Sequence, residues 1–142
     1  MAEAGYSGTP LPKKLGLKDG QVIGFLDLPA ELEELKRAAL FASAEDVAAD
    51  RIGREKERFD VLHLFLTNRS KMEDLAAPAM DAIRRDGMIW ISWPKKSSKL
   101  PTDITEDVIR DVLLPIGLVD VKVCAVNEIW SGLKMVIRKE LR

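Results

Sequence analysis

The sequence predicts an α/β fold: a mostly parallel, Rossmann-like sheet with helices on both faces and an antiparallel hairpin at the C-terminal end. Three observations lead to this fold class. Strand-like apolar segments alternate with amphipathic helical segments, an order that favours parallel strands joined by crossover helices. Segment 59–67 is apolar on both faces, as central strands covered by helices are. Segments 118–126 and 133–139 follow each other without room for a helix, so they pair antiparallel.

The N-terminal part contains a short helix, a strand and a second helix. Thr9 is a capping residue type and Pro10 suits the first helical position, so a helix is expected from there to Gly16. The apolar segment 21–27 predicts the first strand. Pro29 is expected to start the next helix, whose buried side carries apolar residues at helical spacing: Leu32, Leu35 and Ala39.

The middle of the chain has one weak and two strong elements. A short strand is expected near 46–49, before the charged stretch 51–58. The buried-type strand 59–67 follows. The pattern Ser70-x-x-Glu73 is a capping box and predicts a helix that ends near 86–87, with a kink or a restart at Pro78.

The C-terminal part begins with another buried-type strand, 87–93, which Pro94 stops. A loop over 95–101 comes next, and Thr102 or Asp103 is expected to cap a helix. This helix carries apolar residues at helical spacing: Ile104, Val108, Ile109, Val112 and Leu113.

Composition places the chain among ordinary soluble domains and excludes several classes of protein. Its 142 residues fit one domain, 1–142, with 46% hydrophobic and 32% charged residues. The formal net charge of −1 provides no long-range field for nucleic acid or an anionic membrane, so neither partner is expected. One cysteine and one histidine are too few for a zinc site or an internal disulfide. No signal peptide or apolar run of about 20 residues is visible, which favours a cytoplasmic location.

The turn after the first strand is where a nucleotide or adenosyl cofactor would lie in such a fold. Glycines normally let the backbone approach that cofactor, and the next helix directs its amides at a charged group. Segment 26–31 contains no glycine. Leu28 and Ala30 each place a Cβ where the cofactor would approach, and Glu31 adds negative charge. We therefore expect no adenosyl or dinucleotide cofactor, although a pocket for another ligand stays open.

The nucleophiles and bases of the chain have ordinary structural explanations. His63 lies in the middle of strand 59–67, away from its carboxyl end, and is expected to be a hydrogen-bonded core residue. Cys124 lies inside an apolar strand and is expected to fill space there. No catalytic residue and no metal ligand set is predicted.

The best candidate for ligand binding is the loop 93–103, which starts at the carboxyl end of a strand. Lysines suit phosphate or carboxylate groups, and the amides of 102–105 at the next helix are expected to be free for an anion. The N-terminal head would lie nearby. The candidate residues are Ser7, Thr9, Lys13, Trp93, Lys95, Lys96, Thr102 and Asp103. The alternatives are a solvated basic loop and, third, a nucleic-acid contact. The sequence does not decide whether Trp130 is a core residue or forms one side of a pocket.

Two resemblances follow from particular segments. The lead-in 15–22 and the closing hairpin resemble the class I methyltransferase fold, here without its glycines. The head YSGTPL and KKLG, with the later segments SWPKK, TDITED, GLVDVKVCAV and WSGLK, resembles the bacterial family called domain of unknown function 3052. That second resemblance spans nearly the whole chain, except 31–58, and implies a cytosolic bacterial protein without implying an activity.

Three functions are compatible with these patterns. The first is a binding or regulatory domain, without catalysis, for a small anionic ligand or a protein partner. The second is a divergent transferase whose pocket is formed by loop 93–103 and the head. The third is a homodimeric interaction module that pairs through the terminal hairpin, where strand 133–137 would leave an edge free.

Overall fold

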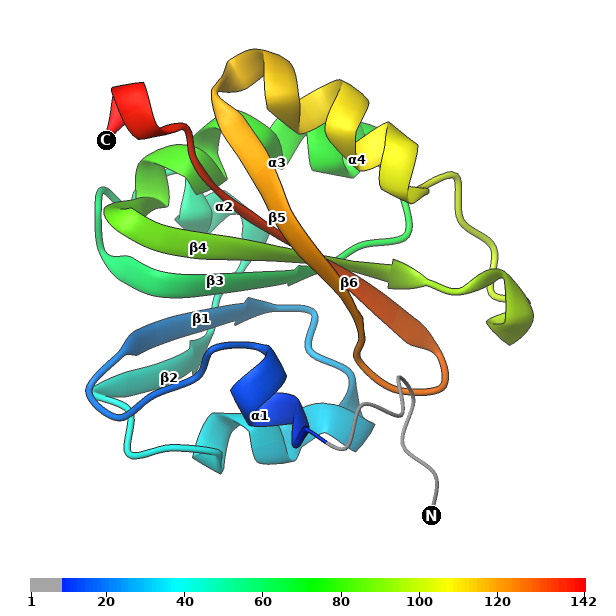
Figure 1. Ribbon diagram of the computed structural model, residues 1–142, viewed down its shortest axis with the longest axis horizontal. Helices are drawn as coiled ribbons and strands as arrows, with labels where there is room; N and C mark the ends of the chain where they lie inside the picture. Colours follow the sequence, from blue (N-terminus) through cyan, green and yellow to red (C-terminus); the bar gives the residue numbers. More distant parts are fainter. Residues whose placement is uncertain (1–8) are drawn as a thin grey trace.

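Six strands form one sheet in the computed structural model, which describes residues 9–142 (Figure 1). They are β1 (Val22–Leu26), β2 (Ser43–Asp46), β3 (Phe59–Phe65), β4 (Ile83–Pro94), β5 (Leu118–Ala125) and β6 (Trp130–Ile137). Their order across the sheet is β2-β1-β3-β4-β6-β5. The pairings among β1, β2, β3 and β4 are parallel, and β6 is antiparallel to both β4 and β5. The predicted α/β sheet with an antiparallel hairpin is therefore confirmed.

The position of the C-terminal hairpin in the sheet differs from the one that the sequence predicted. β6 inserts between β4 and β5, so β5 forms the edge and runs in the same direction as β4. The expectation that strand 133–137 leaves a free edge is wrong, because both sides of β6 are paired. Any pairing with another chain at this end would have to use β5.

Between residues 9 and 142 the chain forms four α-helices and four 3₁₀-helices. The α-helices are α1 (Leu11–Lys14), α2 (Ala49–Ile52), α3 (Arg69–Ala82) and α4 (Glu106–Leu113). The 3₁₀-helices are η1 (Ala30–Arg37), η2 (Lys96–Ser98), η3 (Leu114–Ile116) and η4 (Lys139–Leu141). We call the side of the sheet that packs on α2, α3 and α4 the α3 face, and the side that packs on α1 and η1 the α1 face. Helices thus lie on both faces, as predicted.

Each face has its own hydrophobic core. The α3 face buries the larger one, in which strand residues such as Leu62, Ile89 and Leu133 pack on Leu75, Ala79 and Ile109 of the helices. The α1 face buries a smaller cluster of residues: Leu15, Ile23, Phe25, Leu32, Leu35, Val61, Phe65, Trp90 and Val126. No helix between residues 9 and 142 combines the length and the apolar character that crossing a membrane requires.

The capping residues differ from those that the sequence predicted. Asn68 caps α3 by accepting a hydrogen bond from Lys71 N at 2.9 Å, so Ser70 lies inside the helix. Thr105 caps α4 through Val108 N at 3.1 Å, and neither Thr102 nor Asp103 does. Each of these segments offers more than one capping residue type, and the path of the preceding loop selects among them.

The N-terminal helix also starts differently. Pro10 occupies the N-cap position of α1 without a side-chain hydrogen bond, so Thr9 does not cap this helix and Pro10 is not its first helical residue. Pro12 instead lies in the first turn, where its missing amide hydrogen is not needed.

Several boundaries also move. The short strand β2 occupies 43–46 and not 46–49. Helix α3 continues through Pro78 without a restart and ends at Ala82, because residues 83–86 already belong to β4. The helix predicted after Pro29 is a 3₁₀-helix, in which Leu32 and Leu35, three residues apart, fall on one side and are buried.

Candidate functional site

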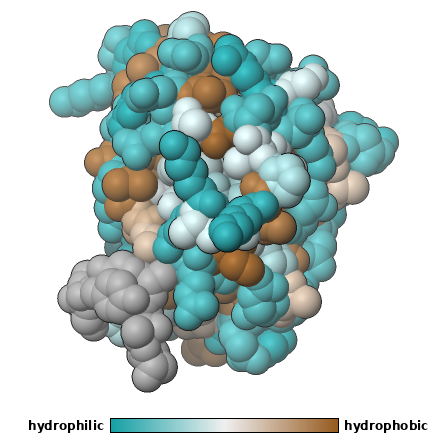
Figure 2. Space-filling model, turned by 90° about the vertical axis from the view of Figure 1, so that its right-hand side faces the viewer, coloured by the Kyte–Doolittle hydropathy of each residue, from teal (hydrophilic) through white to brown (hydrophobic). Residues whose placement is uncertain are grey.

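The strand order has a reversal between β1 and β3. The chain passes from β1 to β2 on one side, and then crosses to β3 on the other side of β1. Open α/β sheets bind ligands outside the carboxyl ends of the strands at such a switch point. The residues at this switch point are Asp27, which follows β1, and Leu66 and Thr67, which follow β3. Figure 2 views the molecule from the side to which these strands point.

An ion pair spans this switch point. Lys71 Nζ, in the first turn of α3, lies 2.9 Å from Asp27 Oδ2. Asp27 holds a left-handed backbone with φ of 56°, which aspartate tolerates better than most residues other than glycine. Both side chains are about half exposed, so the pair adds little stability. Its importance is its position, because it joins the loop after β1 to the helix after β3.

Two hollows meet at this ion pair. The aromatic hollow, of about 320 Å³, is lined by Asp27, Pro29, Phe65, Leu66, Thr67, Lys71 and Trp130. The acidic hollow, of about 610 Å³, is lined by Phe25, Leu26, Asp27, Leu28, Glu33, Asp46, Val47, Ala48, Ala49 and Lys71. Both are within the size range of small-molecule sites, which is about 300–1,000 Å³.

The aromatic hollow has a rigid wall. The Trp130 ring meets the Phe65 ring edge-on with centroids 5.3 Å apart, and Phe65 stacks on His63 at 4.2 Å. Trp130 comes from β6 and Phe65 from the end of β3, so the two strands fix the wall independently of the loops. Trp130 therefore has both of the roles that the sequence left open, because it packs on the α1-face core and lines a hollow.

His63 lies behind this wall and is closed off from solvent, with 1% of its surface exposed. Its Nε2 lies 2.6 Å from the Ser92 hydroxyl, which is also buried. Burial lowers the pKa of His63 to about 3, so the ring is neutral. The predicted role as a hydrogen-bonded core histidine is confirmed.

The acidic hollow is electrostatically mixed. Lys36 Nζ pairs with Asp46 at 2.6 Å and with Glu33 at 3.3 Å, and the hydrogen bond to Asp46 raises the pKa of Lys36. Together with Asp27 and Lys71, the rim carries three carboxylates and two ammonium groups. A surface of this kind suits a neutral or cationic ligand with hydrogen-bond donors better than a free anion.

The turn after β1 carries side chains where cofactor-binding turns carry glycine, and it lines the acidic hollow. Leu28 is half-buried and packs on the α1-face core. Pro29 precedes η1 without a side-chain cap, and Glu31 and Glu33 occupy the first turn. Carboxylates at this position repel the carboxylate or phosphate groups that such turns usually hold.

The predicted loop 93–103 does not line either hollow. Trp93 is 9% exposed and belongs to the α3-face core. Thr102 Oγ1 donates to Thr67 O at 2.8 Å, and Asp103 Oδ1 accepts from Arg69 N at 2.7 Å. These two contacts tie the loop to the end of β3.

Two of the four amides that were expected to be free for an anion are used within the chain. Ile104 N donates to Thr102 Oγ1 at 3.0 Å, and Asp103 N donates to Thr67 O at 3.4 Å. At Asp103 and Ile104 the expectation of free amides is therefore wrong, because Thr67 O and Thr102 Oγ1 already accept hydrogen bonds from them.

The remaining predicted residues are scattered. Lys13 and Lys96 are exposed, and neither they nor Lys95 lines one of the two hollows. Thr9 is the first described residue, and Ser7 lies outside the described residues. Sequence reasoning missed Asp27 and Thr67 as site residues, although each directly follows an apolar strand. No sequence pattern marks Lys71 as a site residue.

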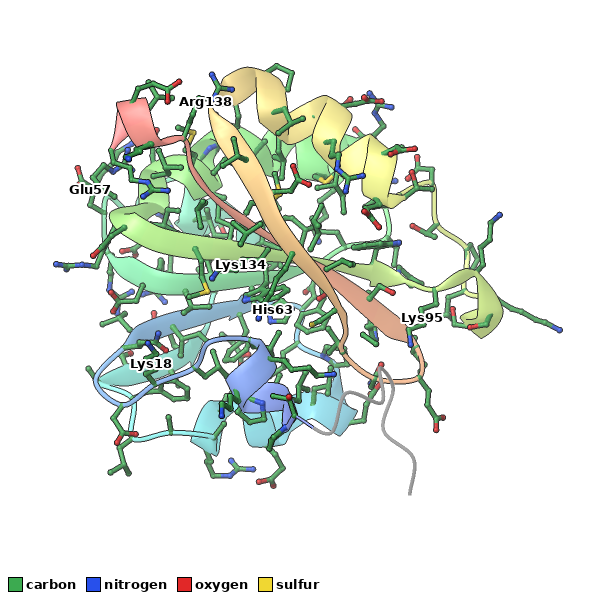
Figure 3. The ribbon with its side chains drawn as sticks, viewed as in Figure 1. Lys18, Glu57, His63, Lys95, Lys134 and Arg138 are labelled. Atoms are coloured by element: carbon green, nitrogen blue, oxygen red, sulfur yellow. The ribbon has the colours of Figure 1, made fainter. Side chains whose placement is uncertain are left out.

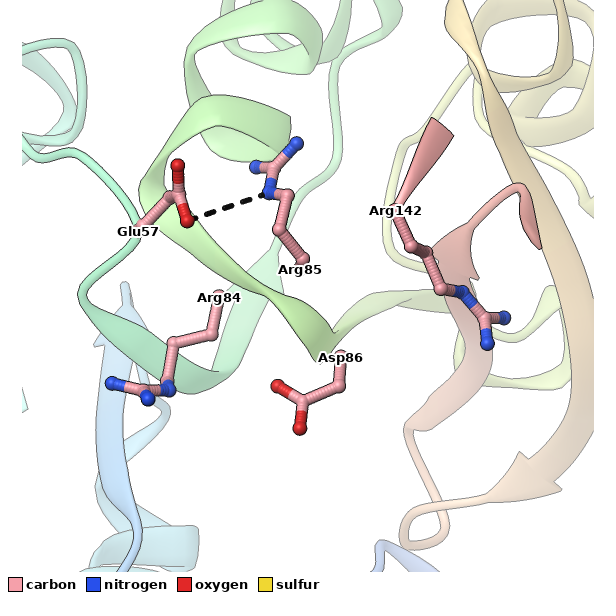
Figure 4. Close-up of a pocket in the computed structure, with 5 residues that line it drawn as sticks. All are labelled: Glu57, Arg84, Arg85, Asp86 and Arg142. Carbon is pink, nitrogen blue, oxygen red and sulfur yellow. Dashed lines mark ion pairs between the residues drawn. The ribbon is translucent and has the colours of Figure 1, made fainter. Parts of the chain in front are cut away.

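A third hollow, of about 350 Å³, lies where the strands begin. Glu57, Arg84, Arg85, Asp86 and Arg142 line it (Figure 4). Its guanidinium groups point in different directions: Arg85 Nη2 donates to Met80 O and Ile83 O, and Arg142 Nε donates to Ile137 O. They do not converge on one anion. Within residues 9–142 no group of three potential metal ligands is present.

Comparison with known proteins gives the fold. No family model matches the chain, and the comparison with curated proteins found no match. Among solved structures, a SAM-dependent methyltransferase from Aquifex aeolicus is similar with a TM-score of 0.64 and 13% identity, over 88% of this chain and 87% of that one. A type 11 methyltransferase from Sulfolobus solfataricus gives 0.59 and 14%, over 91% and 90%. The N-methyltransferase NodS from Bradyrhizobium japonicum gives 0.57 and 12%, over 85% and 88%. The likeness to the class I methyltransferase fold is thereby shown, at identities that carry the fold alone.

Proposed function

We propose that this chain is a small-molecule-binding domain on a methyltransferase-like fold, which binds its ligand at the β1/β3 switch point without transferring a methyl group. The observation that carries the proposal is the meeting of two ligand-sized hollows at the Asp27–Lys71 ion pair. Ligands of open α/β sheets bind at this position, and the fold brings a rigid aromatic wall and several polar groups to it.

The lining indicates the chemistry of the ligand. Trp130 offers a ring against which a planar group can stack, and the Thr67 hydroxyl is a hydrogen-bond partner beside it. Asp27 accepts hydrogen bonds from N–H groups and Lys71 donates to an oxygen. A planar heterocycle with both donors and acceptors fits this set.

S-adenosylmethionine fits the same residues poorly. Its amino-acid carboxylate would face the carboxylates of Asp27 and Glu33, and Leu28 occupies space that bare backbone leaves in cofactor-binding turns. This disagreement supports binding without the usual methyl donor.

A divergent transferase is the second candidate. The match to methyltransferases extends over about nine-tenths of this chain, and the hollows lie at the edge where the fold carries ligands.

Three further expectations stay predictions: the resemblance to the family called domain of unknown function 3052, the cytoplasmic location and the homodimer. The homodimer would now have to pair through β5, the edge strand. A partner at loop 93–103 also stays a prediction.

A thermal-shift screen tests the first proposal. The probes are S-adenosylmethionine, S-adenosylhomocysteine and a set of nucleobases and nucleosides. We expect stabilisation by a heterocycle, with about 2.7 kcal/mol at 100 times its dissociation constant. Trp130→Ala and Lys71→Met should remove this stabilisation, and Lys96→Met, which changes an exposed lysine away from the hollows, should retain it.

Two outcomes would decide against the proposal. Stabilisation by S-adenosylmethionine that disappears in Leu28→Trp favours the transferase. Stabilisation by a heterocycle that persists in both Trp130→Ala and Lys71→Met places the ligand elsewhere.

A further inference from the structure

The α1 face is not covered evenly by helices. Helix α1 and η1 pack near β1, β3 and β4, while the part of this face formed by β5 and β6 carries Lys122, Cys124 and Lys134. Lys134 pairs with Trp90 of β4 in register, which places both on the α1 face. We call the surface around Lys122 and Lys134 the lysine face.

Two lysines stand directly opposite each other on this face. Lys122 of β5 is the register partner of Lys134 of β6. Directly opposite residues in an antiparallel pair have Cβ atoms about 4.5–5.5 Å apart, and like charges there are destabilising. The sequence therefore carries an unfavourable pair in the middle of the hairpin, next to the register shift between Asp120 and Lys122.

Acidic residues do not compensate this pair. Among the described residues, Lys18, Lys95, Lys122 and Lys134 take part in no ion pair, whereas most arginines of the chain do. Lys18 comes from the loop after α1, and Lys95 lies where β4 passes the start of β6, with its amide bonded to Ile129 O (both are labelled in Figure 3).

The pKa values report the same concentration of positive charge. Burial lowers the pKa of Lys134, and the charges of Lys122 and Lys18 lower it further. Burial raises the pKa of Cys124 in β5, and the charges of Lys14, Lys122 and Lys95 partly offset this rise. Lys122 and Lys134 thus stand side by side in the middle of this surface, while Lys18 and Lys95 lie towards opposite ends of the sheet (Figure 3).

We propose that the lysine face binds the phosphate groups of a small ligand. Lysines are flexible point charges that suit phosphate, and a group with two or more negative charges would turn the Lys122–Lys134 repulsion into attraction. The Lys122–Lys134 pair is local and the chain as a whole is almost neutral, which favours a small polyphosphate over nucleic acid, whose binding needs an extended basic surface. This site is separate from the hollows at Asp27 and Lys71.

The test uses the full chain and the variant Lys134→Met, which keeps the length of the side chain and removes its charge. Without ligand, the variant should melt at a higher temperature than the wild type, because the repulsion is gone. Its affinity for inorganic tripolyphosphate, measured by calorimetry, should fall at least about 10-fold, which is about 1.4 kcal/mol. Lys122→Met, at an exposed position, should do the same.

Control probes and a control variant separate this site from general salt effects. Lys139→Met lies in η4, away from the lysine face, and should change neither quantity. Adenosine triphosphate and tripolyphosphate distinguish a nucleotide source of the phosphates from a free polyphosphate: equal affinity indicates the latter, and tighter binding of the nucleotide the former.

Three results would overturn the proposal. One is tripolyphosphate binding that Lys134→Met and Lys122→Met leave unchanged. Another is stabilisation by sulfate at equal ionic strength that matches the effect of tripolyphosphate. The third is binding of a single-stranded oligonucleotide that is lost in Lys134→Met while tripolyphosphate does not bind.

Discussion

The two faces of the sheet are covered by different kinds of helices and buried side chains. On the α3 face, α3 and α4 supply 14 and 8 residues of helix, and the buried side chains there are almost all aliphatic. On the α1 face, α1 has 4 residues and η1 is a 3₁₀-helix, so large rings fill the space: Phe25, Phe65 and Trp90 around His63.

This difference changes how accessible the middle of each face is. The α3 face is closed by mostly aliphatic side chains along α3 and α4, and it reaches a hollow only at the carboxyl ends of the strands, where Leu26, Val47 and Ala49 line the acidic hollow. The α1 face has less helix, buries a polar pair, and borders both the aromatic hollow and the lysine face. Both hollows lie at the carboxyl ends of the strands, and the lysine face lies on the side that the shorter helices cover.

The largest expected effect is at the centre of the α1 face. Trp90 is fully buried, and its Nε1 donates to Leu15 O at 3.0 Å. Trp90→Ala should lower the free energy of unfolding by about 3–5 kcal/mol, because it leaves a cavity and an unpaired carbonyl. Denaturant unfolding measures this; Trp90→Phe should cost clearly less. A decrease in the free energy of unfolding of less than about 1 kcal/mol would contradict the packing of α1 and Leu15 on Trp90.

Acid should weaken the α1 face through His63. Its folded pKa of about 3 is below the ordinary 6.5, so the unfolded chain binds the proton more readily. The stabilising contribution of the neutral ring is complete above pH 6.5 and is lost as the pH falls towards 3, at up to about 1.4 kcal/mol per pH unit. Between pH 6.5 and 5 this amounts to about 2 kcal/mol.

Unfolding curves at several pH values check the acid effect. The double variant His63→Leu with Ser92→Ala removes the titrating group together with its partner, and its stability should fall less steeply over this range. Equal slopes for the wild type and the double variant would show that His63 is not the group that titrates.

The α3 face should resist added volume. A Cβ at Gly24 would lie 2.8 Å from both Phe59 and Val47, so Gly24→Ala should cost about 1–3 kcal/mol by overpacking. Gly53 is the matched control, because it has φ of −66° and a Cβ there would meet only Asp50 O, at an ordinary contact distance of 3.8 Å. Gly53→Ala should be neutral or stabilising by about 0.4–1 kcal/mol. Similar melting temperatures for the two variants would contradict tight packing here.

The smallest expected effect is at the cap of α3. Asn68→Ala should lower the free energy of unfolding by about 1 kcal/mol, because Lys71 N loses its acceptor. Ser70→Ala should change it by less than about 0.5 kcal/mol, since Ser70 is inside the helix. The reverse ranking in thermal unfolding would support the capping box that the sequence predicted.

The candidate site could be predicted in part. The carboxyl ends of the first and third strands were visible in the sequence, so Asp27 and Thr67 were within reach of the switch-point rule. The Asp27–Lys71 pair was not, because its members are 44 residues apart and meet only through parallel pairing of β1 with β3. The loop 93–103 was chosen for its lysines, but its amides and hydroxyls bind the chain itself.

The sequence by itself determined the elements whose cause is local: apolar strands, the antiparallel relation of the last two strands, the buried His63 and the turn without glycine. These depend on side-chain periodicity and backbone preference over a few residues. The tertiary structure alone decided that β6 lies inside the sheet, that Asn68 and not Ser70 caps α3, and that Lys122 stands opposite Lys134. Pairing order and register depend on contacts between distant segments, which no local pattern contains.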